Sequence, residues 1–334
     1  MRIAVVGAGA IGGYLAARLA AAGEEVTVIA RGANLAAIRA NGLRLIQEDG
    51  SEIEARGLRA FERPEEAGPQ DYVLLALKAH QVEPIARSVP SLFGEHTALV
   101  PLQNGIPWWY FYNHGGPYAG RTVRSVDPNG AISAAIDSAR IIGCVVFPAA
   151  NLIAPGVIQV VEGNRFTLGE PDGNESSRMK VLAEILTRAG FKAPITADIR
   201  GEIWLKLWGN MTFNPISALT HATLVDICQF PLTRELSTTM MREAETVANK
   251  LGITFRVGIE RRIAGAERVG AHKTSMLQDI EQGRPIELDA LVGSVVELAA
   301  LTETPTPAIN AIYAATSLLA RTLETQKGRL QIRS

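Results

Sequence analysis

The chain begins with apolar and turn-forming segments in an order that is typical of a β-α-β unit. Residues 1–6 (MRIAVV) form a short apolar run, and residues 14–22 (YLAARLAAA) have the composition of a helix that stops at Gly23. A second apolar run covers residues 26–30 and ends at Arg31. Because short buried strands that alternate with helices favour a parallel sheet, we expect a strand, a helix and a second strand here.

The same reasoning predicts strands and helices up to about residue 195. The expected strands cover residues 43–47, 52–60, 71–78, 97–102, 140–149 and 156–169, and the expected helices cover residues 34–40, 81–93 and 176–189. Asp49-Gly50 separates the first two of these strands and predicts a hairpin. We expect the two latest strands to complete the sheet.

Glycines separate the first strand from the first helix at positions 7, 9 and 12. In a dinucleotide-binding fold the first permits a tight turn, the second lets the backbone approach a pyrophosphate, and the third lets the helix lie close to its strand. The N–H groups at the helix start then bind the phosphates. The candidate cofactor contacts are Gly7, Ala8, Gly9, Ala10, Ile11 and Gly12; the alternative is a glycine-rich turn without a ligand.

The residue at the end of the second strand indicates which nicotinamide cofactor binds. Enzymes that use NAD usually carry an acid there, whereas a basic residue accommodates the 2′-phosphate of NADP. This chain has Arg31 at that point, and Glu24 and Glu25 lie at the opposite end of the strand. We therefore predict NADPH rather than NADH; alternatively, Arg31 is a solvated surface residue.

Two further polar residues follow expected strands. Lys78 and Asn104 come at the carboxyl ends of the strands at residues 71–78 and 97–102. Ligands of open α/β sheets bind outside the carboxyl ends of the strands, so both residues are expected at the same crevice as Arg31. The alternatives are a solvated lysine and an asparagine that only forms a turn before Gly105.

From about residue 196 the chain becomes almost wholly helical. The expected helices cover residues 198–219, 232–251, 258–269, 286–301 and 307–323. We place the domain boundary near residues 193–197, which gives domains 1–195 and 196–334. The predicted fold is α/β: an N-terminal Rossmann-type doubly wound sheet followed by an all-helical C-terminal domain.

The first long helix of the second domain carries the strongest candidate chemistry. Lys206, Asn210 and Asn214 stand at i, i+4 and i+8, which puts them on one helical face among tryptophans and leucines. A small polar substrate would satisfy these groups. The alternative is an exposed polar stripe opposite a packed face.

Two more candidates lie further along. Ser275 is placed to bind a substrate carboxylate or hydroxyl, and Glu287 is expected in the first turn of a helix. An acid in that position also stabilises the helix dipole without any catalytic role. The segment 108–112 (WWYFY) lines a pocket, forms a partner surface or is a plain hydrophobic plug.

Composition excludes several other classes of function. The net charge of −1 gives no sign of nucleic-acid or membrane-surface binding, and no apolar run reaches the roughly 18 residues of a membrane span. The start of the chain lacks the pattern of a signal peptide, so we expect a soluble cytoplasmic protein. Cys144 and Cys228 are expected to be buried free thiols, and the five histidines are too scattered for a metal site.

Several segments, taken together, resemble a known family. They are GAGAIGG at 7–13, LKAHQ at 77–81, QNG at 103–105, WLKLWGNMTFNPISAL at 204–219, and SMLQDI with PIELD within 275–289. The combination is similar to the ketopantoate reductases, the 2-dehydropantoate 2-reductases of pantothenate synthesis. The resemblance implies NADPH-dependent reduction of a 2-oxo acid, with 2-dehydropantoate as the expected substrate, by a protein that is often a homodimer.

The resemblance also implies roles for individual residues. It implies cofactor contacts by the glycine loop, Arg31, Lys78, Asn104, Ala149 and Glu287. It implies that Lys206 is the catalytic proton donor, with Glu287 beside it, and that substrate contacts are made by Asn104, Lys206, Asn210, Asn214 and Ser275.

Two departures from the family lie on the substrate side. The connection from residue 106 to residue 137 is longer than usual, and Leu224 stands where well-known members carry a substrate-contacting asparagine. An NADPH-dependent reductase of another 2-oxo acid is therefore the main alternative. A non-catalytic nucleotide-sensing protein is the second.

Overall fold

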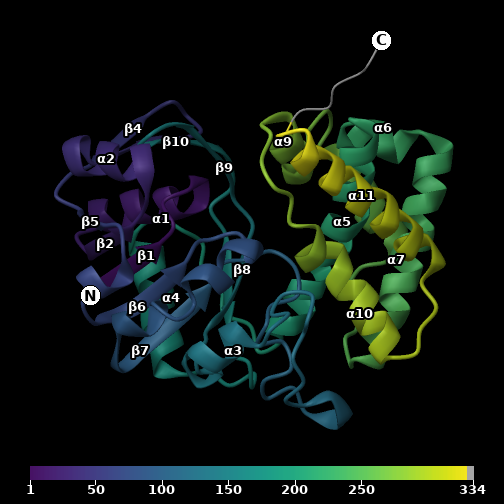
Figure 1. The fold of residues 1–334 in the computed structure, drawn as a ribbon, viewed down its shortest axis with the longest axis horizontal. Helices are drawn as coiled ribbons and strands as arrows, with labels where there is room; N and C mark the ends of the chain where they lie inside the picture. The colour runs from purple at the N-terminus through teal and green to yellow at the C-terminus, as the bar shows by residue number, and fades with distance from the viewer. Residues whose placement is uncertain (329–334) are drawn as a thin grey trace. The chain divides into compact units, whose positions relative to one another are not determined.

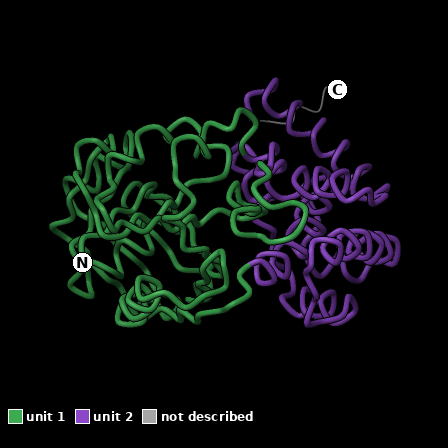
Figure 2. Tube along the Cα trace, turned by 90° about the horizontal axis from the view of Figure 1, so that it is seen from below, with its two compact units in different colours: residues 1–122, 127–199 green, residues 123–126, 200–334 purple. Residues whose placement is uncertain are grey.

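The structure, a computed structural model, describes residues 1–328. The chain divides into two compact units, coloured separately in Figure 2. Unit 1 comprises residues 1–122 and 127–199, and unit 2 comprises residues 123–126 together with the described residues from Arg200 onward. The short segment 123–126 thus belongs to the unit that holds the later part of the sequence.

Unit 1 is built on a five-stranded sheet in the order β5-β2-β1-β6-β7 (Figure 1). Its strands are β1 (Arg2–Val6), β2 (Glu25–Ile29), β5 (Arg59–Phe61), β6 (Gln70–Leu75) and β7 (Phe93–Pro101). All neighbouring pairs are parallel, which confirms the expected opening unit with α1 (Ala10–Ala21) between β1 and β2. Loops that follow these strands therefore share one edge of the sheet.

A second sheet covers the other side of α1, in the order β4-β3-β10-β9. Its strands are β3 (Leu43–Ile46), β4 (Glu52–Ala55), β9 (Ala149–Ala154) and β10 (Val157–Glu162). The expected hairpin forms, with Leu43 opposite Ala55. Gly13 permits the close approach, because a Cβ there would lie 2.6 Å from the Ile158 side chain.

The prediction that residues 140–169 complete the parallel sheet was wrong. Strands β9 and β10 join the second sheet, while β8 (Gly143–Val146) and β11 (Phe166–Gly169) form a separate antiparallel pair. The physical reason lies in α1, which is apolar on nearly every side and buries residues from Gly12 to Ala17 without a break. A helix of that kind needs apolar cover on both faces, and the β9–β10 hairpin supplies the second.

The expected helix at residues 81–93 is also different in the structure. It consists of three short 3₁₀ turns, η2 (Ala79–Gln81), η3 (Glu83–Ile85) and η4 (Val89–Leu92). Pro84 and Pro90 stand near the starts of the last two, where their missing N–H is tolerated. The remaining helical elements of unit 1 are α2 (Gly32–Asn41), η1 (Pro64–Glu66), η5 (Gly116–Tyr118), α3 (Ala131–Ala135), η6 (Ser138–Arg140) and α4 (Ser177–Arg188).

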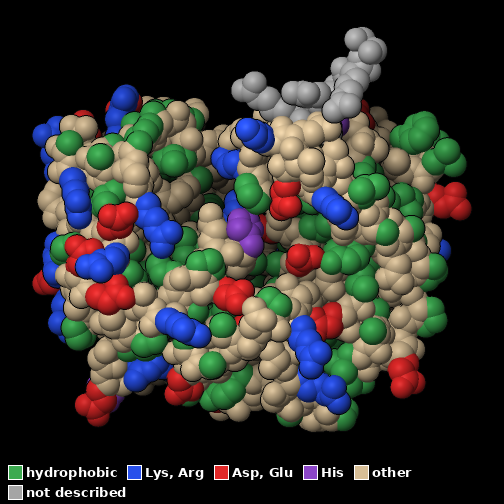
Figure 3. All heavy atoms as spheres, viewed as in Figure 1, with side chains coloured by type: hydrophobic (Ala, Val, Ile, Leu, Met, Phe, Trp, Pro, Cys, Tyr) green, Lys and Arg blue, Asp and Glu red, His purple; other side chains and the backbone are tan. Residues whose placement is uncertain are grey.

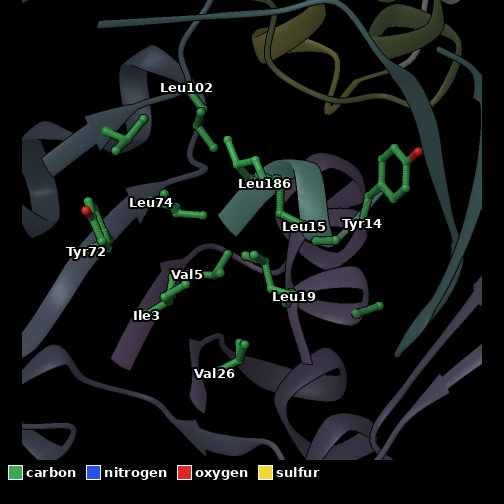
Figure 4. Packing of buried hydrophobic residues seen from close by; sticks show 14 of the residues in the cluster. Ile3, Val5, Tyr14, Leu15, Leu19, Val26, Tyr72, Leu74, Leu102 and Leu186 are labelled. Atoms are coloured by element: carbon green, nitrogen blue, oxygen red, sulfur yellow. The ribbon is translucent and has the colours of Figure 1, made fainter. Parts of the chain in front are cut away.

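The core of unit 1 lies between the parallel sheet and its helices (Figure 4). Ile3 and Val5 of β1 are fully buried, as is Leu19 of α1, and Leu186 of α4 is almost so. The aromatic segment also lies inside: Trp108 to Phe111 are each at most 5% exposed. This burial favours the hydrophobic plug over a partner surface.

Unit 2 contains only helical elements among the described residues. They are α5 (Ile199–Thr220), α6 (Leu224–Gln229), α7 (Pro231–Lys250), α8 (Ile259–Arg268), α9 (Ser275–Glu281), the π-helical turn η7 (Asp289–Gly293), α10 (Ser294–Leu301) and α11 (Pro307–Thr325). Trp204 and Trp208 of α5 are fully buried, and the ring of Trp208 stacks on Phe255 at 3.9 Å. These contacts fix which side of α5 faces inward.

None of the described helices has the length and apolar character needed to cross a membrane. Basic and acidic side chains are interspersed over the face drawn in Figure 3, in keeping with a net charge of −1.

Candidate active site

The glycine loop between β1 and α1 has the geometry of a phosphate cradle. Gly7 adopts a φ of +99°, which side chains other than hydrogen rarely allow. A Cβ on Gly12 would lie 1.8 Å from the Gly7 carbonyl oxygen and 2.9 Å from the Cβ of Ala76. The fold itself therefore requires glycine at both positions, with or without a ligand.

Gly9 differs from these two, because a Cβ added there would meet no protein atom within 4 Å. It is the N-cap residue of α1 and supplies no side-chain cap. The first N–H groups of α1 have no hydrogen-bond partners within the helix. Nothing in the fold requires glycine at position 9, whereas a pyrophosphate held by those N–H groups would. The loop from Gly7 to Gly12 thus fits a dinucleotide.

Sequence reasoning missed a residue that fixes this loop. The side chain of Asn34 donates to the carbonyl of Ala8 at 2.6 Å and accepts from the N–H of Gly156 at 2.7 Å. It therefore ties the glycine loop to the β9–β10 hairpin. An asparagine in the first turn of a helix is an ordinary surface residue by pattern, so only the structure reveals the role.

The structure places Arg31, Lys78 and Asn104 after β2, β6 and β7, at the carboxyl edge of the parallel sheet. Arg31 is exposed at the N-cap of α2, and Lys78 is half-buried at the N-cap of η2. Gln103, beside Asn104, donates to the carbonyls of Leu75 and Leu77 at 2.7 and 2.9 Å. It holds the ends of β6 and β7 together and was not assigned a role from the sequence.

Ala149 is half-buried at the start of β9, where it pairs with Glu162 of β10. It thus belongs to the sheet that covers α1, and α1 itself contacts β9.

In unit 2, the face formed by Lys206, Asn210 and Asn214 lies in the middle part of α5. Lys206 and Asn210 are half-buried, and Asn214 is only 5% exposed. The Asn214 amide nitrogen is buried without a hydrogen-bond partner among the described residues. A buried donor of this kind costs about 1–3 kcal/mol, so these residues do not form a solvated stripe.

Pro215 stands directly after Asn214 inside α5. It has no N–H to donate to the carbonyl of residue 211, so the helical hydrogen-bond ladder is interrupted beside the candidate site.

The other candidates of unit 2 lie at helix starts. Ser275 is the first residue of α9 and is exposed, and the Thr274 hydroxyl caps that helix by accepting from the Leu277 N–H. Glu287 is half-buried and precedes the helix instead of lying in its first turn, because its carbonyl accepts from the Leu291 N–H at 3.2 Å. Glu287 thus lies one residue before the helix that the sequence predicts to contain it.

The turn after Glu287 is π-helical and was not expected. Tyr313 of α11 donates a hydrogen bond to Asp289 in this turn at 2.7 Å, and burial, with Asp289 beside it, raises the pKa of the Tyr313 hydroxyl to about 12. The phenol therefore stays protonated and continues to fix the turn at neutral pH. π-turns of this kind often accompany functional sites.

Comparisons with known proteins bear on both units. Residues 3–173 match the family described as Ketopantoate reductase PanE/ApbA, and residues 198–320 match Ketopantoate reductase PanE/ApbA C terminal. A 2-dehydropantoate 2-reductase from Mesorhizobium japonicum is 54% identical over 329 residues, which cover 98% of this chain and 99% of the relative. The chain belongs to the ketopantoate reductase family. The resemblance drawn from the motifs is thereby confirmed.

Solved structures support the same ketopantoate reductase fold. A 2-dehydropantoate 2-reductase from Geobacter metallireducens has 28% identity and a TM-score of 0.83, over 96% of this chain and 100% of that one. A structure from Ralstonia solanacearum, named as a candidate ketopantoate reductase, has 41% identity and a TM-score of 0.92, over 97% of this chain and 98% of that one. These matches confirm the predicted combination of an N-terminal parallel sheet and a helical C-terminal domain.

Proposed function

We propose that this chain reduces 2-dehydropantoate to pantoate and uses NADPH. The observation that carries the proposal is the presence, in one chain, of an open phosphate cradle at Gly9 and a half-buried lysine beside two amides on α5. Membership of the ketopantoate reductase family supports it, because the relative from Mesorhizobium japonicum bears the name of that activity. The chain is thus an oxidoreductase that acts on a CH–OH group.

The cofactor is held by unit 1 in this proposal. The first N–H groups of α1 bind the pyrophosphate, and Gly9 leaves room for it. Arg31 and Lys78, which follow the strands on either side of β1, bind the 2′-phosphate and select NADPH over NADH. Asn104 lies beside the nicotinamide ribose, and Ala149 lines the cofactor side of the site. NADPH, when bound, supplies the hydride.

The proton is supplied by unit 2. Reduction of a ketone develops negative charge on its oxygen, and the ammonium group of Lys206 stabilises that charge and transfers a proton to it. A positioned general acid of this kind contributes roughly 10²–10⁴-fold. Asn210 orients the oxygen, Asn214 and Ser275 hold the other polar groups of the substrate, and Glu287 acts beside Lys206 and the cofactor.

The proposal is tested by following NADPH oxidation by the purified chain with 2-dehydropantoate, and then with NADH in place of NADPH. We expect one pantoate formed for each NADPH oxidised, with NADH a much poorer donor. Failure to oxidise NADPH with any 2-oxo acid would instead support a non-catalytic nucleotide-binding role.

One observation favours a second candidate, a reductase of another 2-oxo acid. Leu224, the first residue of α6, is half-buried and presents an isobutyl group where well-known members of the family carry an amide. Steady-state assays on a panel of 2-oxo acids distinguish the two candidates, since high kcat/KM for another acid and negligible kcat/KM for 2-dehydropantoate would favour the second.

We further propose a cytoplasmic homodimer that binds no nucleic acid. The near-neutral net charge supports the last point, and the family resemblance supports the dimer. Light scattering in solution tests the dimer, and the expected mass is twice that of one chain.

A further inference from the structure

Unit 2 contains a cation that the proposed mechanism does not use. Arg262 lies on α8 and is only partly accessible to solvent. Its Nε atom is buried and has no hydrogen-bond partner among residues 1–328. Burial lowers the pKa of the Arg262 guanidinium below its ordinary value, although the group stays charged at neutral pH.

Two other arginines of unit 2 are neutralised by acids. Arg234 pairs with Glu260 and Glu267, and Arg256 pairs with Glu202. No ion pair joins Arg262 to any acidic side chain in the described part of the chain. A buried charge without a counterion is costly, by several kcal/mol in typical cases, so an anion that reached it would be strongly favoured.

The guanidinium lies against α5 at Gly209. A Cβ at this position would be 2.1 Å from one terminal nitrogen of Arg262 and 2.8 Å from its Cζ. Glycine at 209 therefore provides the space that the guanidinium occupies. Because the helix makes one turn in 3.6 residues, Gly209 is an immediate neighbour of Lys206 on the surface of α5, and it directly precedes Asn210.

Helix α8 also packs against α6, and the Arg262 guanidinium is near enough to the Cys228 thiol to lower its pKa, although burial outweighs this effect. The thiol of Cys228 on α6 lies 3.7 Å from the carbonyl of Ile263, the residue next to Arg262. Cys228 is fully buried and stands four residues after Leu224, so the two share a face of α6. The cation is thus held between the candidate face of α5 and the helix in which leucine replaces the family's amide.

We propose that Arg262 binds the carboxylate of the 2-oxo acid and is a specificity-determining residue of this chain. This inference rests on the proposed function. A 2-oxo acid carries its carboxylate on the carbon next to the ketone, so the group that binds the carboxylate must lie within a few ångströms of the group that protonates the ketone oxygen. Gly209 is about 4.5 Å further along the helix axis than Lys206, which suits that separation.

The chemistry of the guanidinium also fits. Its planar fork binds a carboxylate through two parallel hydrogen bonds, which fixes orientation as well as charge. Lys206 is then not needed to bind the carboxylate. In this chain Leu224 cannot make the hydrogen bond that the asparagine of well-known family members makes, and the Arg262 guanidinium supplies a charged donor in its place.

The test uses Arg262→Met, which keeps the apolar stem and removes the charge. We expect the KM for the 2-oxo acid to rise about 10–100-fold, because hydrogen bonds to charged groups contribute about 1.5–3 kcal/mol, with little change in the KM for NADPH. Gly209→Ala should raise the same KM by displacing the guanidinium. Arg261→Met, an exposed neighbour on the same helix, is the matched control and should leave all constants unchanged.

A binding measurement separates this role from a structural one. Thermal unfolding of the wild type should shift upward with pantoate and with small 2-oxo acids but not with their neutral amides, and Arg262→Met should lose this preference. Without ligand the variant should be at least as stable as the wild type, because an uncompensated buried charge has been removed.

The outcomes are distinguishable. An Arg262→Met protein with wild-type KM and the wild-type preference for the acid would overturn the inference, as would a wild type stabilised equally by acid and amide. If 2-dehydropantoate is not reduced but other 2-oxo acids stabilise the wild type in an Arg262-dependent way, the proposed function fails while the role of Arg262 stands.

Discussion

The glycine loop of unit 1 and the polar face of α5 in unit 2 are built in different ways. The loop uses backbone groups: Gly7 and Gly12 are required by positive φ and by contact with the chain itself, and Gly9 leaves open space. The α5 face uses side chains, and its surroundings come from other helices, such as Arg262 of α8 over Gly209. A backbone site is encoded within a dozen consecutive residues, whereas a side-chain site depends on distant segments.

The largest effect is expected on the side-chain site. Lys206→Ala should lower kcat/KM for the 2-oxo acid by about 10²–10⁴-fold, because the developing oxyanion loses its proton donor, while NADPH binds as before. Steady-state kinetics and fluorescence titration of NADPH measure the two quantities. Lys180→Ala, which removes an exposed lysine of α4, is the control. Normal turnover by Lys206→Ala would reject the assignment.

The backbone site is tested by comparing two glycines. Gly12→Ala should lower the free energy of unfolding by several kcal/mol, because its methyl group would lie 1.8 Å from the Gly7 carbonyl oxygen. Gly9→Ala should fold normally, since no protein atom is in the way, yet bind NADPH at least about tenfold more weakly. Urea unfolding and NADPH titration of both variants measure these quantities. If the two variants lost the same stability and the same affinity for NADPH, the assignment of Gly9 to a phosphate cradle would be wrong.

A smaller effect is expected at the strand end. Arg31→Ala should raise the KM for NADPH about tenfold, since one charge-assisted hydrogen bond to the 2′-phosphate is lost, and should leave the KM for NADH unchanged. Kinetics with each cofactor measure the ratio. An equal rise in the KM for NADPH and for NADH would count against a contact between Arg31 and the 2′-phosphate.

The smallest effect is a pH dependence of stability carried by unit 2. Burial is the main reason that the pKa of the Cys228 thiol rises from 9.0 to about 11. A thiol that stays protonated in the folded state but ionises in the unfolded state costs stability as the pH rises above 9. We expect the wild type to lose about 1 kcal/mol more than Cys228→Ala between pH 8 and pH 10, measured by urea unfolding. The same loss in both proteins would assign the effect to another group.

The contrast between the two sites explains what the sequence predicts. The β1-α1-β2 unit, the β3–β4 hairpin and the long helix α5 follow from local patterns, and the family motifs agree with the comparisons. The β9–β10 hairpin was wrongly placed because the need to cover α1 on both sides arises only after α1 has packed on the sheet.

Contacts between distant segments were likewise beyond the sequence. Asn34 fixes the loop at Ala8, and Tyr313 fixes the turn after Glu287, but each looks like an ordinary helix residue in its own segment. Arg262 gave no signal either, because the glycine that accommodates it is 53 positions away in the chain. The roles of the candidate site residues remain predictions that the variants above test.

The most direct test of the central claim, that Lys206 protonates the ketone oxygen, is a crystal structure of the chain with NADP and pantoate. We expect the Lys206 Nζ to lie about 2.6–3.2 Å from the pantoate hydroxyl oxygen that derives from the ketone. A complex in which the hydroxyl contacts another donor and Lys206 points elsewhere would contradict it.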